Sequence, residues 1–376
     1  MIRTVLIIGL GVGYLQACSP GTSHTQGKPP GEEKVGRERA KFEPEDGKCI
    51  LFIGQELEAL GGLEAPWNDG YLDHFQRPGG FTMYTNFSQG DSSFGYELKG
   101  LDGLESTDDW GDSPSNMSKQ LEDPNFANMA LAIGLGFVNH EADVANGRYD
   151  DQVLRLGNWI KGLGKRPVFL RIGYEFGGEW NHYDKELYKV AFRKIKETYD
   201  SLGVENVAYV WQSHGWGQDL EELESWYPGD EYVDWCAYSF FSRFDEAQMI
   251  PFARRHGKPV FIAEASATIS TPTVKTNGKT KETIFSNPEQ AQEAWDKWFI
   301  PFFQAIDEHP DVIKAVSYIN CNWRSHPMWF ENPTFQDIDA RIQTSSMISE
   351  RWKEKVYQAP FIQASDSLYK LLWQGE

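Results

Sequence analysis

From Cys49 onward the chain alternates short apolar segments with longer stretches of helical periodicity, and this alternation constrains the fold more than any other feature. The apolar segments are rich in β-branched and aromatic residues, as strands buried on both faces require. They lie at 50–53, 81–85, 129–138, 168–172, 207–211, 233–241, 259–264 and 313–319. Eight strands separated by helices predict an α/β fold of the (β/α)8 TIM barrel type, and an open doubly wound sheet is the alternative.

The stretches between these strands place apolar side chains on one face of each expected helix. In 185–202, for example, Leu187, Val190, Ala191, Ile195 and Tyr199 recur at helical spacing. The expected helices are 151–163, 185–202, 220–226, 245–256, 288–308 and 341–356. The polar stretch 88–112 has no periodicity and is long for a connection, so we expect it to shape a cleft.

Two of the predicted strands end in a carboxylate. The apolar run 168–172 gives way to Gly173, Tyr174 and Glu175, and the run that begins at Pro259 ends at Glu264. Because the active site of a barrel lies at the C-terminal ends of its strands, both carboxylates fall at that end. An isolated glutamate at a strand end is as compatible with a solvated loop, but two such carboxylates are the minimum that glycoside hydrolysis requires.

Other polar and aromatic side chains follow the predicted strands and are candidates to line the cleft. Gln55, Asn139 and His214 are polar residues at strand ends. Trp180 and Trp211 are candidates for sugar-binding subsites, with burial in the core as the alternative for each. Aromatic residues make up 14% of the chain, and their rings can stack on the apolar faces of sugars.

Charge and cysteine content exclude several other classes of protein. A formal net charge of −19 argues against nucleic acid or an anionic membrane surface as a partner. Cys49, Cys236 and Cys321 each lie in an apolar run, so we expect buried free thiols. No cysteine and histidine residues have the spacing of metal ligands, and the sequence therefore predicts neither a metal nor another cofactor.

The N-terminus has the pattern of a processing segment. Arg3 precedes an apolar stretch at 5–15, and L-Q-A-C at 15–18 is similar to a bacterial lipobox with Cys18 as the lipidated residue. Because Gln16 is not the usual small residue, plain cleavage and secretion is the alternative. We therefore expect a signal peptide at 1–17, a polar flexible tether at 18–46 and a catalytic barrel at 47–376.

The motifs resemble those of the clan A glycoside hydrolases, and within them family 26, which includes β-mannanases and β-1,3-xylanases. The family motif R-x-x-x-E-x-x-G stands here as R-I-G-Y-E-F-G-G at 171–178, followed by Trp180 and Asn181. The run 226–234 is similar to the family's approach to strand six, and 259–265 to its nucleophile strand. The resemblance implies that Glu175 is the acid/base and Glu264 the nucleophile of a retaining mechanism.

The resemblance also implies roles for further residues around the two glutamates. Tyr238, or Phe240 in the competing register, would correspond to the tyrosine that hydrogen-bonds the nucleophile, and Trp323 to an aromatic platform under the sugar. Arg171 would contact either sugar or a carboxylate. Tyr174 stands where the mannanases have histidine, which puts mannan specificity in question. The residues assigned to substrate binding are Arg171, Tyr174, Trp180, Asn181, Trp211, His214, Tyr238, Trp323, Asn139 and Gln55.

The expected function is hydrolysis of a β-linked polysaccharide or oligosaccharide by a retaining, endo-acting enzyme with two glutamates. The expected form is a monomer, attached to the bacterial outer membrane or cell surface by its lipid anchor alone; periplasmic or secreted forms are the alternatives. The sugar stays open among β-mannan, β-1,3-xylan, β-1,3-glucan and marine galactans. The alternative function is a non-catalytic glycan-binding lipoprotein that has the barrel fold.

Overall fold

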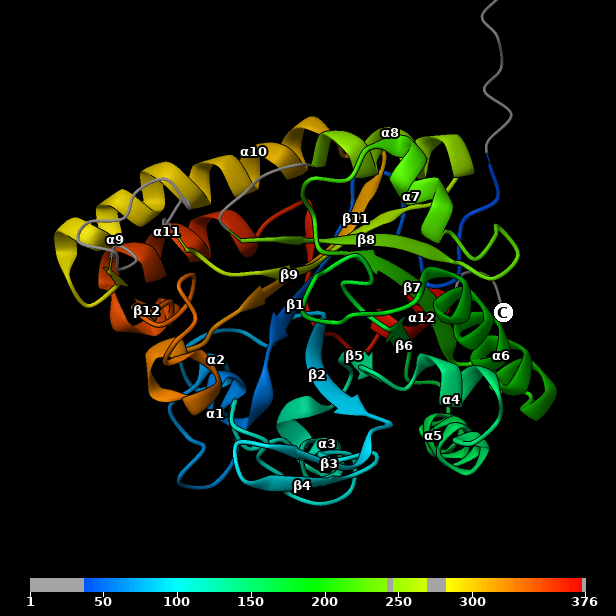
Figure 1. The fold of residues 1–376 in the computed structure, drawn as a ribbon. Coiled ribbons are helices and arrows are strands. Elements are labelled where there is room, and N and C mark those ends of the chain that lie inside the picture. Colours follow the sequence, from blue (N-terminus) through cyan, green and yellow to red (C-terminus); the bar gives the residue numbers. More distant parts are fainter. Residues whose placement is uncertain (1–36, 242–245, 269–281, 374–376) are drawn as a thin grey trace, which may run out of the picture. The chain divides into compact units, whose positions relative to one another are not determined.

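The computed structural model describes residues 37–241, 246–268 and 282–373. Within them, parallel strands form a closed barrel (Figure 1). Each strand pairs with the next along the chain, and the last pairs with the first. The barrel strands are β1 (Cys49–Gly54), β2 (Gly80–Asn86), β5 (Ala130–Gly136), β6 (Val168–Ile172), β7 (Val207–Ser213), β8 (Trp235–Phe240), β9 (Val260–Ala265) and β11 (Ile313–Ile319). The structure confirms the predicted (β/α)8 barrel and excludes the open sheet, because β11 closes on β1.

Helices surround the barrel, as the alternation in the sequence predicts. The longer ones are α5 (Asp150–Gly162), α6 (Lys185–Leu202), α7 (Leu220–Trp226), α8 (Glu246–His256), α9 (Pro288–Ala294), α10 (Ile300–Glu308) and α11 (Ser346–Val356). A π-helical segment at Trp295–Phe299 joins α9 to α10, so 288–308 is helical throughout, as expected. None of the helices in these ranges is long and apolar enough to cross a membrane.

Short elements that the sequence pattern did not predict lie in the connections. They are α1 (Glu56–Leu60), α2 (Tyr71–His74), α3 (Met117–Glu122), α4 (Glu141–Ala145) and α12 (Leu368–Trp373), and the short strands β3 (Gln89–Ser93), β4 (Tyr96–Lys99), β10 (Thr283–Ile284), β12 (Ile338–Asp339) and β13 (Phe361–Ile362). The polar stretch 88–112 contains the antiparallel hairpin β3–β4. The pair β10–β12 is parallel, and β13 pairs with the first residues of β1.

Helix α6 shows how local sequence sets an element. The Asp184 side chain accepts hydrogen bonds from the first backbone N–H groups of the helix, and Gly203 ends it in the left-handed conformation at φ 66°. Ala191, Ile195 and Tyr199 are buried as predicted, and the buried face also includes Tyr188 and Phe192. Val190 was predicted to face the core but is 46% exposed.

The core has two layers, one between strands and helices and one inside the barrel. Inside, the rings of Phe52 and Phe169 lie 5.3 Å apart, and those of Phe52 and Phe261 lie 5.0 Å apart. Phe42 joins this inner cluster, with its ring 5.8 Å from that of Phe169, and so do Leu368 and Leu372 of α12. The N-terminal ends of the strands are therefore closed by side chains from both ends of the compact unit.

The boundary expected between the tether and the barrel at Asp46 is wrong. The compact unit begins at Arg39, and Phe42 is 2% exposed. The Trp235 indole also donates a hydrogen bond of 2.8 Å to the Lys41 carbonyl. The polar composition of 18–46 did not indicate that Phe42 would be buried. Burial of the Phe42 ring attaches the chain to the barrel from Arg39 onward. The lipidation site expected at Cys18 lies outside the described residues.

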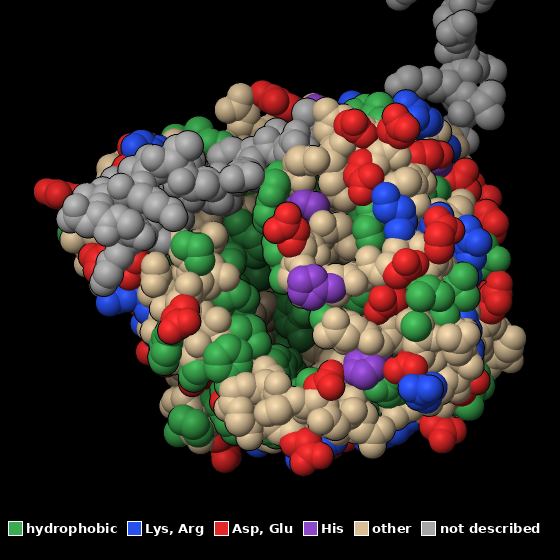
Figure 2. All heavy atoms as spheres, viewed as in Figure 1, with side chains coloured by type: hydrophobic (Ala, Val, Ile, Leu, Met, Phe, Trp, Pro, Cys, Tyr) green, Lys and Arg blue, Asp and Glu red, His purple; other side chains and the backbone are tan. Residues whose placement is uncertain are grey.

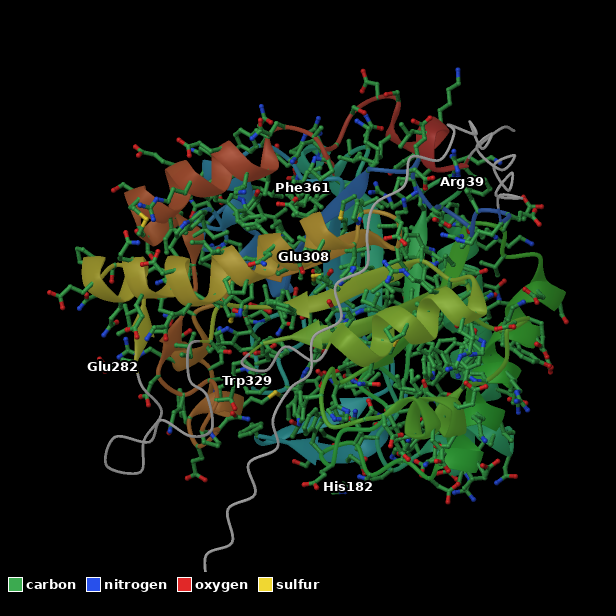
Figure 3. All side chains as sticks on the ribbon, turned by 90° about the horizontal axis from the view of Figure 1, so that it is seen from above. Arg39, His182, Glu282, Glu308, Trp329 and Phe361 are labelled. Carbon is green, nitrogen blue, oxygen red and sulfur yellow. The ribbon has the colours of Figure 1, made fainter. Side chains whose placement is uncertain are left out.

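The two ends of the barrel differ in what covers them. Arg39 and Phe361 belong to segments at the N-terminal ends of the strands, whereas His182 and Trp329 belong to loops that follow β6 and β11 (Figure 3). Figure 2 views the C-terminal end and shows a hollow lined largely by hydrophobic side chains, with acidic and histidine side chains along one side. The C-terminal end is therefore the open face, where a barrel positions its functional side chains.

Candidate active site

Glu175 lies in the sharp turn that follows β6. Gly173 and Glu175 both have left-handed backbone conformations, at φ 54° and 56°. A Cβ atom at position 173 would come within 2.6 Å of the Tyr188 ring, so only glycine fits there. The Asn181 side chain donates hydrogen bonds to the carbonyls of Tyr174 and Glu175, at 3.0 and 2.9 Å. These contacts hold a backbone conformation that is unfavourable for glutamate and place its side chain, 8% exposed, at the mouth of the barrel.

Glu264 reaches the same place through an irregularity in β9. Phe261 and Ala263 face the barrel interior, so simple alternation would point Glu264 outward. The pairing of β8 with β9 shifts between Tyr238 and Ser239, and Ser239 lies opposite Glu264. This bulge turns the Glu264 carboxylate into the barrel, where it is 4% exposed.

The Glu264 carboxylate is held by donors from two other strands. The Tyr84 hydroxyl on β2 donates to Oε1 at 2.7 Å, and the Arg171 guanidinium on β6 donates to the same atom at 2.6 Å. Arg171 also donates to the Gln212 side chain on β7 at 2.9 Å. Its guanidinium lies over the rings of Tyr84 and Tyr174, at 4.8 and 5.3 Å from their centroids. Both donors stabilise negative charge on Glu264 and fix its orientation.

One hydroxyl bridges the two glutamates. Ser239 Oγ donates to Glu175 Oε1 at 2.6 Å and lies 3.3 Å from Glu264 Oε2. The oxygens on either side of Ser239 are therefore no more than about 6 Å apart, which agrees with the separation of about 5–5.5 Å between the carboxyls of retaining glycosidases. Because the hydroxyl has a single proton, it can serve only one of the two carboxylates at a time. When Glu175 is protonated, its carboxyl can donate to Ser239 Oγ, and the Ser239 hydroxyl is then able to donate to Glu264.

The electrostatics of the pair favour that proton. Burial raises the pKa of Glu175 well above its usual range, and the negative charge of Glu264 raises it further. Hydrogen bonds from Ser239 and Trp180 oppose the rise but do not reverse it. Glu175 is thus a neutral acid at a pH where an ordinary glutamate is ionised, beside a carboxylate held by Arg171.

Trp180, His214 and Trp216 form an aromatic wall beside Glu175. The Trp180 indole donates to Glu175 Oε2 at 3.0 Å, and Trp180 is 47% exposed. Its ring lies 5.9 Å from His214 and 5.7 Å from Trp216. His214 is 7% exposed, and burial lowers its pKa. The structure thus brings two of the predicted substrate-binding residues, Trp180 and His214, next to the predicted acid.

Three residues predicted to bind substrate are buried in structural roles instead. Arg171 has no exposed surface, so its partner is the Glu264 carboxylate rather than sugar. Trp211 faces the helices rather than the barrel interior. It is also fully buried, and its ring stacks on that of Phe176 with the centroids 4.5 Å apart. Asn181 is 6% exposed, and its amide holds the turn after β6.

The position predicted for Tyr238 is taken by other residues. Tyr238 and Phe240 both pack in the outer core, and the residue between them, Ser239, faces the barrel. Tyr84 is the tyrosine that hydrogen-bonds Glu264. The sequence analysis missed Tyr84 and Ser239, although Thr82 and Tyr84 alternate with the apolar residues Phe81 and Met83 in β2. That period of two was the available signal that both face the barrel interior.

The remaining predicted residues lie at different depths around the hollow. Tyr174 is half-buried, with its ring 5.2 Å from that of Tyr84 and thus beside the carboxylates. Asn139 is exposed after β5. Gln55 is buried and donates to Asp112 at 2.6 Å. Trp323 is only 2% exposed, so it is covered by neighbouring residues and is no open platform.

Away from the two glutamates, one group of potential metal ligands occurs within the described ranges. Glu56, Cys321 and His326 bring their ligand atoms within 4.8 Å of one another. All three side chains are buried. The sequence analysis predicted no metal, because Glu56 is far from Cys321 and His326 in the chain.

Comparisons with known proteins find a matching family and two similar sequences. The model of glycosyl hydrolase family 26 matches residues 136–316. A β-1,3-xylanase from Vibrio sp. is 30% identical over 356 residues, covering 89% of this chain and 70% of that protein. A β-1,3-xylanase from Alcaligenes sp. is 29% identical over 354 residues, covering 88% and 68%.

Solved structures of low sequence identity share the fold. GH26C from Muricauda sp. has a TM-score of 0.56 at 13% identity, covering 87% of this chain and 90% of that one. The family 26 β-mannanase of Bacteroides ovatus has a TM-score of 0.53 at 14% identity, covering 86% and 93%. The family match and the Vibrio relative together establish the family of this chain. The chain belongs to glycosyl hydrolase family 26 and is a glycoside hydrolase.

Proposed function

We propose that this enzyme is a retaining, endo-acting β-1,3-xylanase with Glu264 as nucleophile and Glu175 as acid/base. The observation that carries the proposal is the pair of glutamates on either side of Ser239, one neutral and one held by Arg171 and Tyr84. Their separation suits direct attack rather than the wider gap that an inverting enzyme needs for water. The substrate is inferred from two relatives that are β-1,3-xylanases and align with nearly nine-tenths of this chain.

In the first step, Glu264 attacks the anomeric carbon while Glu175 protonates the leaving glycosidic oxygen. Tyr84 and Arg171 both bind Glu264 Oε1, so Oε2 is the freer oxygen and the one that attacks. The products of this step are a covalent glycosyl-enzyme ester and the released chain end. Trp180, half exposed beside Glu175, is positioned to contact the departing sugar.

In the second step, Glu175 removes a proton from water, which attacks the ester and restores the free Glu264 carboxylate. The change of role follows from the electrostatics of the pair. Ester formation removes the negative charge on Glu264, which is the second cause of the raised pKa of Glu175. The pKa of Glu175 therefore falls in the intermediate, and the acid of the first step becomes the base of the second.

The test is a reducing-end assay on β-1,3-xylan, β-mannan, β-1,3-glucan and marine galactans. We expect oligosaccharides from β-1,3-xylan, and the first products should have the retained β configuration by NMR. A mixture of oligosaccharide lengths at early times would support endo cleavage. Inverted products would overturn the retaining mechanism, and activity on another glycan alone would overturn the substrate.

Matched variants test the two roles. Glu175→Gln and Glu264→Gln should each lose nearly all hydrolysis while keeping the circular dichroism of the wild type. Glu186→Gln, which changes an exposed glutamate on α6, is the control and should retain full activity. If the wild type bound a glycan but released no reducing ends, the protein would be the non-catalytic glycan-binding alternative.

We also propose that Cys18 carries a lipid that anchors the enzyme to the bacterial membrane. The proposal rests on the L-Q-A-C pattern at 15–18 and on the polar stretch that follows it. Cys18→Ser should move the protein from the membrane fraction to the soluble fraction of the expressing bacterium. Membrane association that persists in this variant would contradict the anchor.

A further inference from the structure

Glu56, Cys321 and His326 meet at the open end of the barrel, on the side of β1 and β11. Glu56 lies two residues beyond the end of β1, and Cys321 lies two residues beyond the end of β11. His326 separates two short 3₁₀ turns, Trp323–Ser325 and Pro327–Trp329, in the same loop as Cys321. Because β1 and β11 are paired, the segments that follow them are neighbours, and the three ligand atoms lie within 4.8 Å of one another.

Among the described residues no cation pairs with the Glu56 carboxylate, and the groups that approach it with a proton to donate are the Cys321 thiol and the Gln55 amide. Glu56 is 2% exposed, and neither of its oxygens has a hydrogen-bonding partner of good geometry among the described residues. The Glu56 backbone is in the left-handed region, at φ 51°, which is an unfavourable conformation for glutamate. In this conformation the side chain points inward. A buried carboxylate without a counter-charge is costly, and a bound cation would remove that cost.

Most charged neighbours of the cluster are also negative; Arg341, which acts on Cys321 and His326, is positive but is itself paired with Asp339 at 2.8 Å. Asp112 acts electrostatically on both Glu56 and Cys321, and Asp339 acts on Cys321. Asp112 itself receives hydrogen bonds from Gln55 and from the Trp329 indole, at 2.6 Å each. A cation among Glu56, Cys321 and His326 would therefore be attracted by the Glu56 carboxylate and by the nearby carboxylates of Asp112 and Asp339.

We propose that Glu56, Cys321 and His326 bind one Zn²⁺ ion. Thiolate sulfur, imidazole nitrogen and carboxylate oxygen are the ligands that zinc takes in proteins. With the usual bond lengths, tetrahedral zinc keeps its ligand atoms about 3.3–3.8 Å apart, so the cluster needs to contract by only about 1 Å. Cys321 releases its thiol proton to solvent on binding, and three protein ligands leave one coordination position for water.

The bound ion would fasten the loop after β11 to the end of β1. That loop carries Trp323, whose indole donates to Ser266 just beyond the nucleophile strand, and Trp329, whose indole donates to Asp112. Zinc would thereby hold this wall of the hollow in place. The role is structural support of the site and is independent of which glycan the enzyme cleaves.

Cobalt substitution tests the ligand set directly. The untagged, full-length protein is freed of metal and titrated with Co²⁺, and a thiolate-to-cobalt charge-transfer band in the near ultraviolet is expected at one ion per chain. Cys321→Ser should lose the band. Cys236→Ser, which changes a buried thiol in β8, is the matched control and should keep it. No band in the wild type, or an undiminished band in Cys321→Ser, would overturn the proposal.

Thermal unfolding gives a second readout that does not depend on the thiol. Zn²⁺ should raise the Tm of the wild type, and a chelator should reverse the rise. Glu56→Gln should unfold no earlier than the metal-free wild type, because it removes an unpartnered charge, and it should gain nothing from Zn²⁺. An equal rise in Tm for Glu56→Gln, or none in the wild type, would contradict zinc binding at these residues.

Discussion

At the scale of single residues, the two glutamates differ because of what surrounds them. Glu264 accepts hydrogen bonds from Tyr84 and Arg171, whereas Glu175 is buried beside the negative charge of Glu264. Ser239 contacts both carboxylates. The two environments thus favour a proton on one glutamate and a negative charge on the other, as the proposed roles of acid/base and nucleophile require.

Tyr84→Phe tests the support of the nucleophile. A hydrogen bond to a charged group contributes about 1.5–3 kcal/mol, so its loss should lower kcat/KM by about 10- to 100-fold without unfolding the protein. Steady-state kinetics on the substrate identified by the glycan panel would measure the loss. Tyr232→Phe, which removes a hydroxyl bound to Glu197 at the surface, is the control. An unchanged kcat/KM in Tyr84→Phe would show that this bond does not assist the reaction.

Ser239→Ala tests the pKa of the acid. The hydrogen bond from Ser239 lowers the pKa of Glu175, so its removal should raise that pKa further. Because Glu175 must be protonated to act as the acid, the alkaline limb of the kcat/KM profile should move to higher pH.

The control for Ser239→Ala is Ser317→Ala, which removes another hydroxyl inside the barrel, bound to Thr82 rather than to a glutamate. Its alkaline limb should match that of the wild type. An alkaline limb that stays in place or moves to lower pH in Ser239→Ala would contradict the role of Glu175 as the acid.

At the scale of elements, the loop from β6 to α6 contains two side chains with different tasks, one beside the proposed acid/base and one at the start of the helix. Asn181 donates hydrogen bonds to the consecutive carbonyls of Tyr174 and Glu175, in the turn that presents the Glu175 side chain. Asp184, three residues later, caps the helix. The first contact fixes the backbone from which the proposed acid/base extends, and the second satisfies backbone N–H groups at the start of α6.

Asn181→Ala and Asp184→Ala should therefore have different effects. Asn181→Ala should lower kcat/KM by roughly tenfold, because Glu175 loses its fixed direction. Asp184→Ala should lower the free energy of unfolding by about 1 kcal/mol and leave kcat/KM within about twofold of the wild type. Urea denaturation and steady-state kinetics on both variants would check this. Equal losses of activity would show that the whole loop, rather than the turn, positions Glu175.

At the scale of the whole compact unit, the barrel depends on segments from outside the eight strands. Phe42 and α12 cover the N-terminal ends of the strands, where Phe52, Phe169 and Phe261 fill the interior. The functional side chains occupy the opposite end. Closure at one end leaves the other free to carry the polar groups of the site.

Phe42→Ala tests this closure. Truncation of a buried phenylalanine typically lowers the free energy of unfolding by about 3–5 kcal/mol. Chemical denaturation should show a loss of this size, whereas Phe330→Ala, at a position that is 54% exposed, should change stability by less than about 0.5 kcal/mol. A neutral Phe42→Ala would mean that residues 39–46 act as part of the tether, as composition alone suggested.

The sequence by itself determined the strands, most helices and the place of the two glutamates along them. Apolar runs such as 168–172 bury both faces wherever they lie, so their strand character is local. Glu175 and Glu264 follow or end such runs, and the C-terminal ends of parallel strands meet at one end of a barrel. Fold and candidate catalytic residues could therefore be predicted before any contact was known.

Tertiary structure decided which side chains meet those glutamates. The bulge that turns Glu264 inward arises from the pairing of β8 with β9, and one step of register exchanges Tyr238 for Ser239. Tyr84 reaches Glu264, and Glu56 reaches Cys321, across separations in sequence that no local pattern records. Periodicity reports how a residue relates to its own element, whereas partners depend on how separate elements pack, and only the closed barrel fixes that packing.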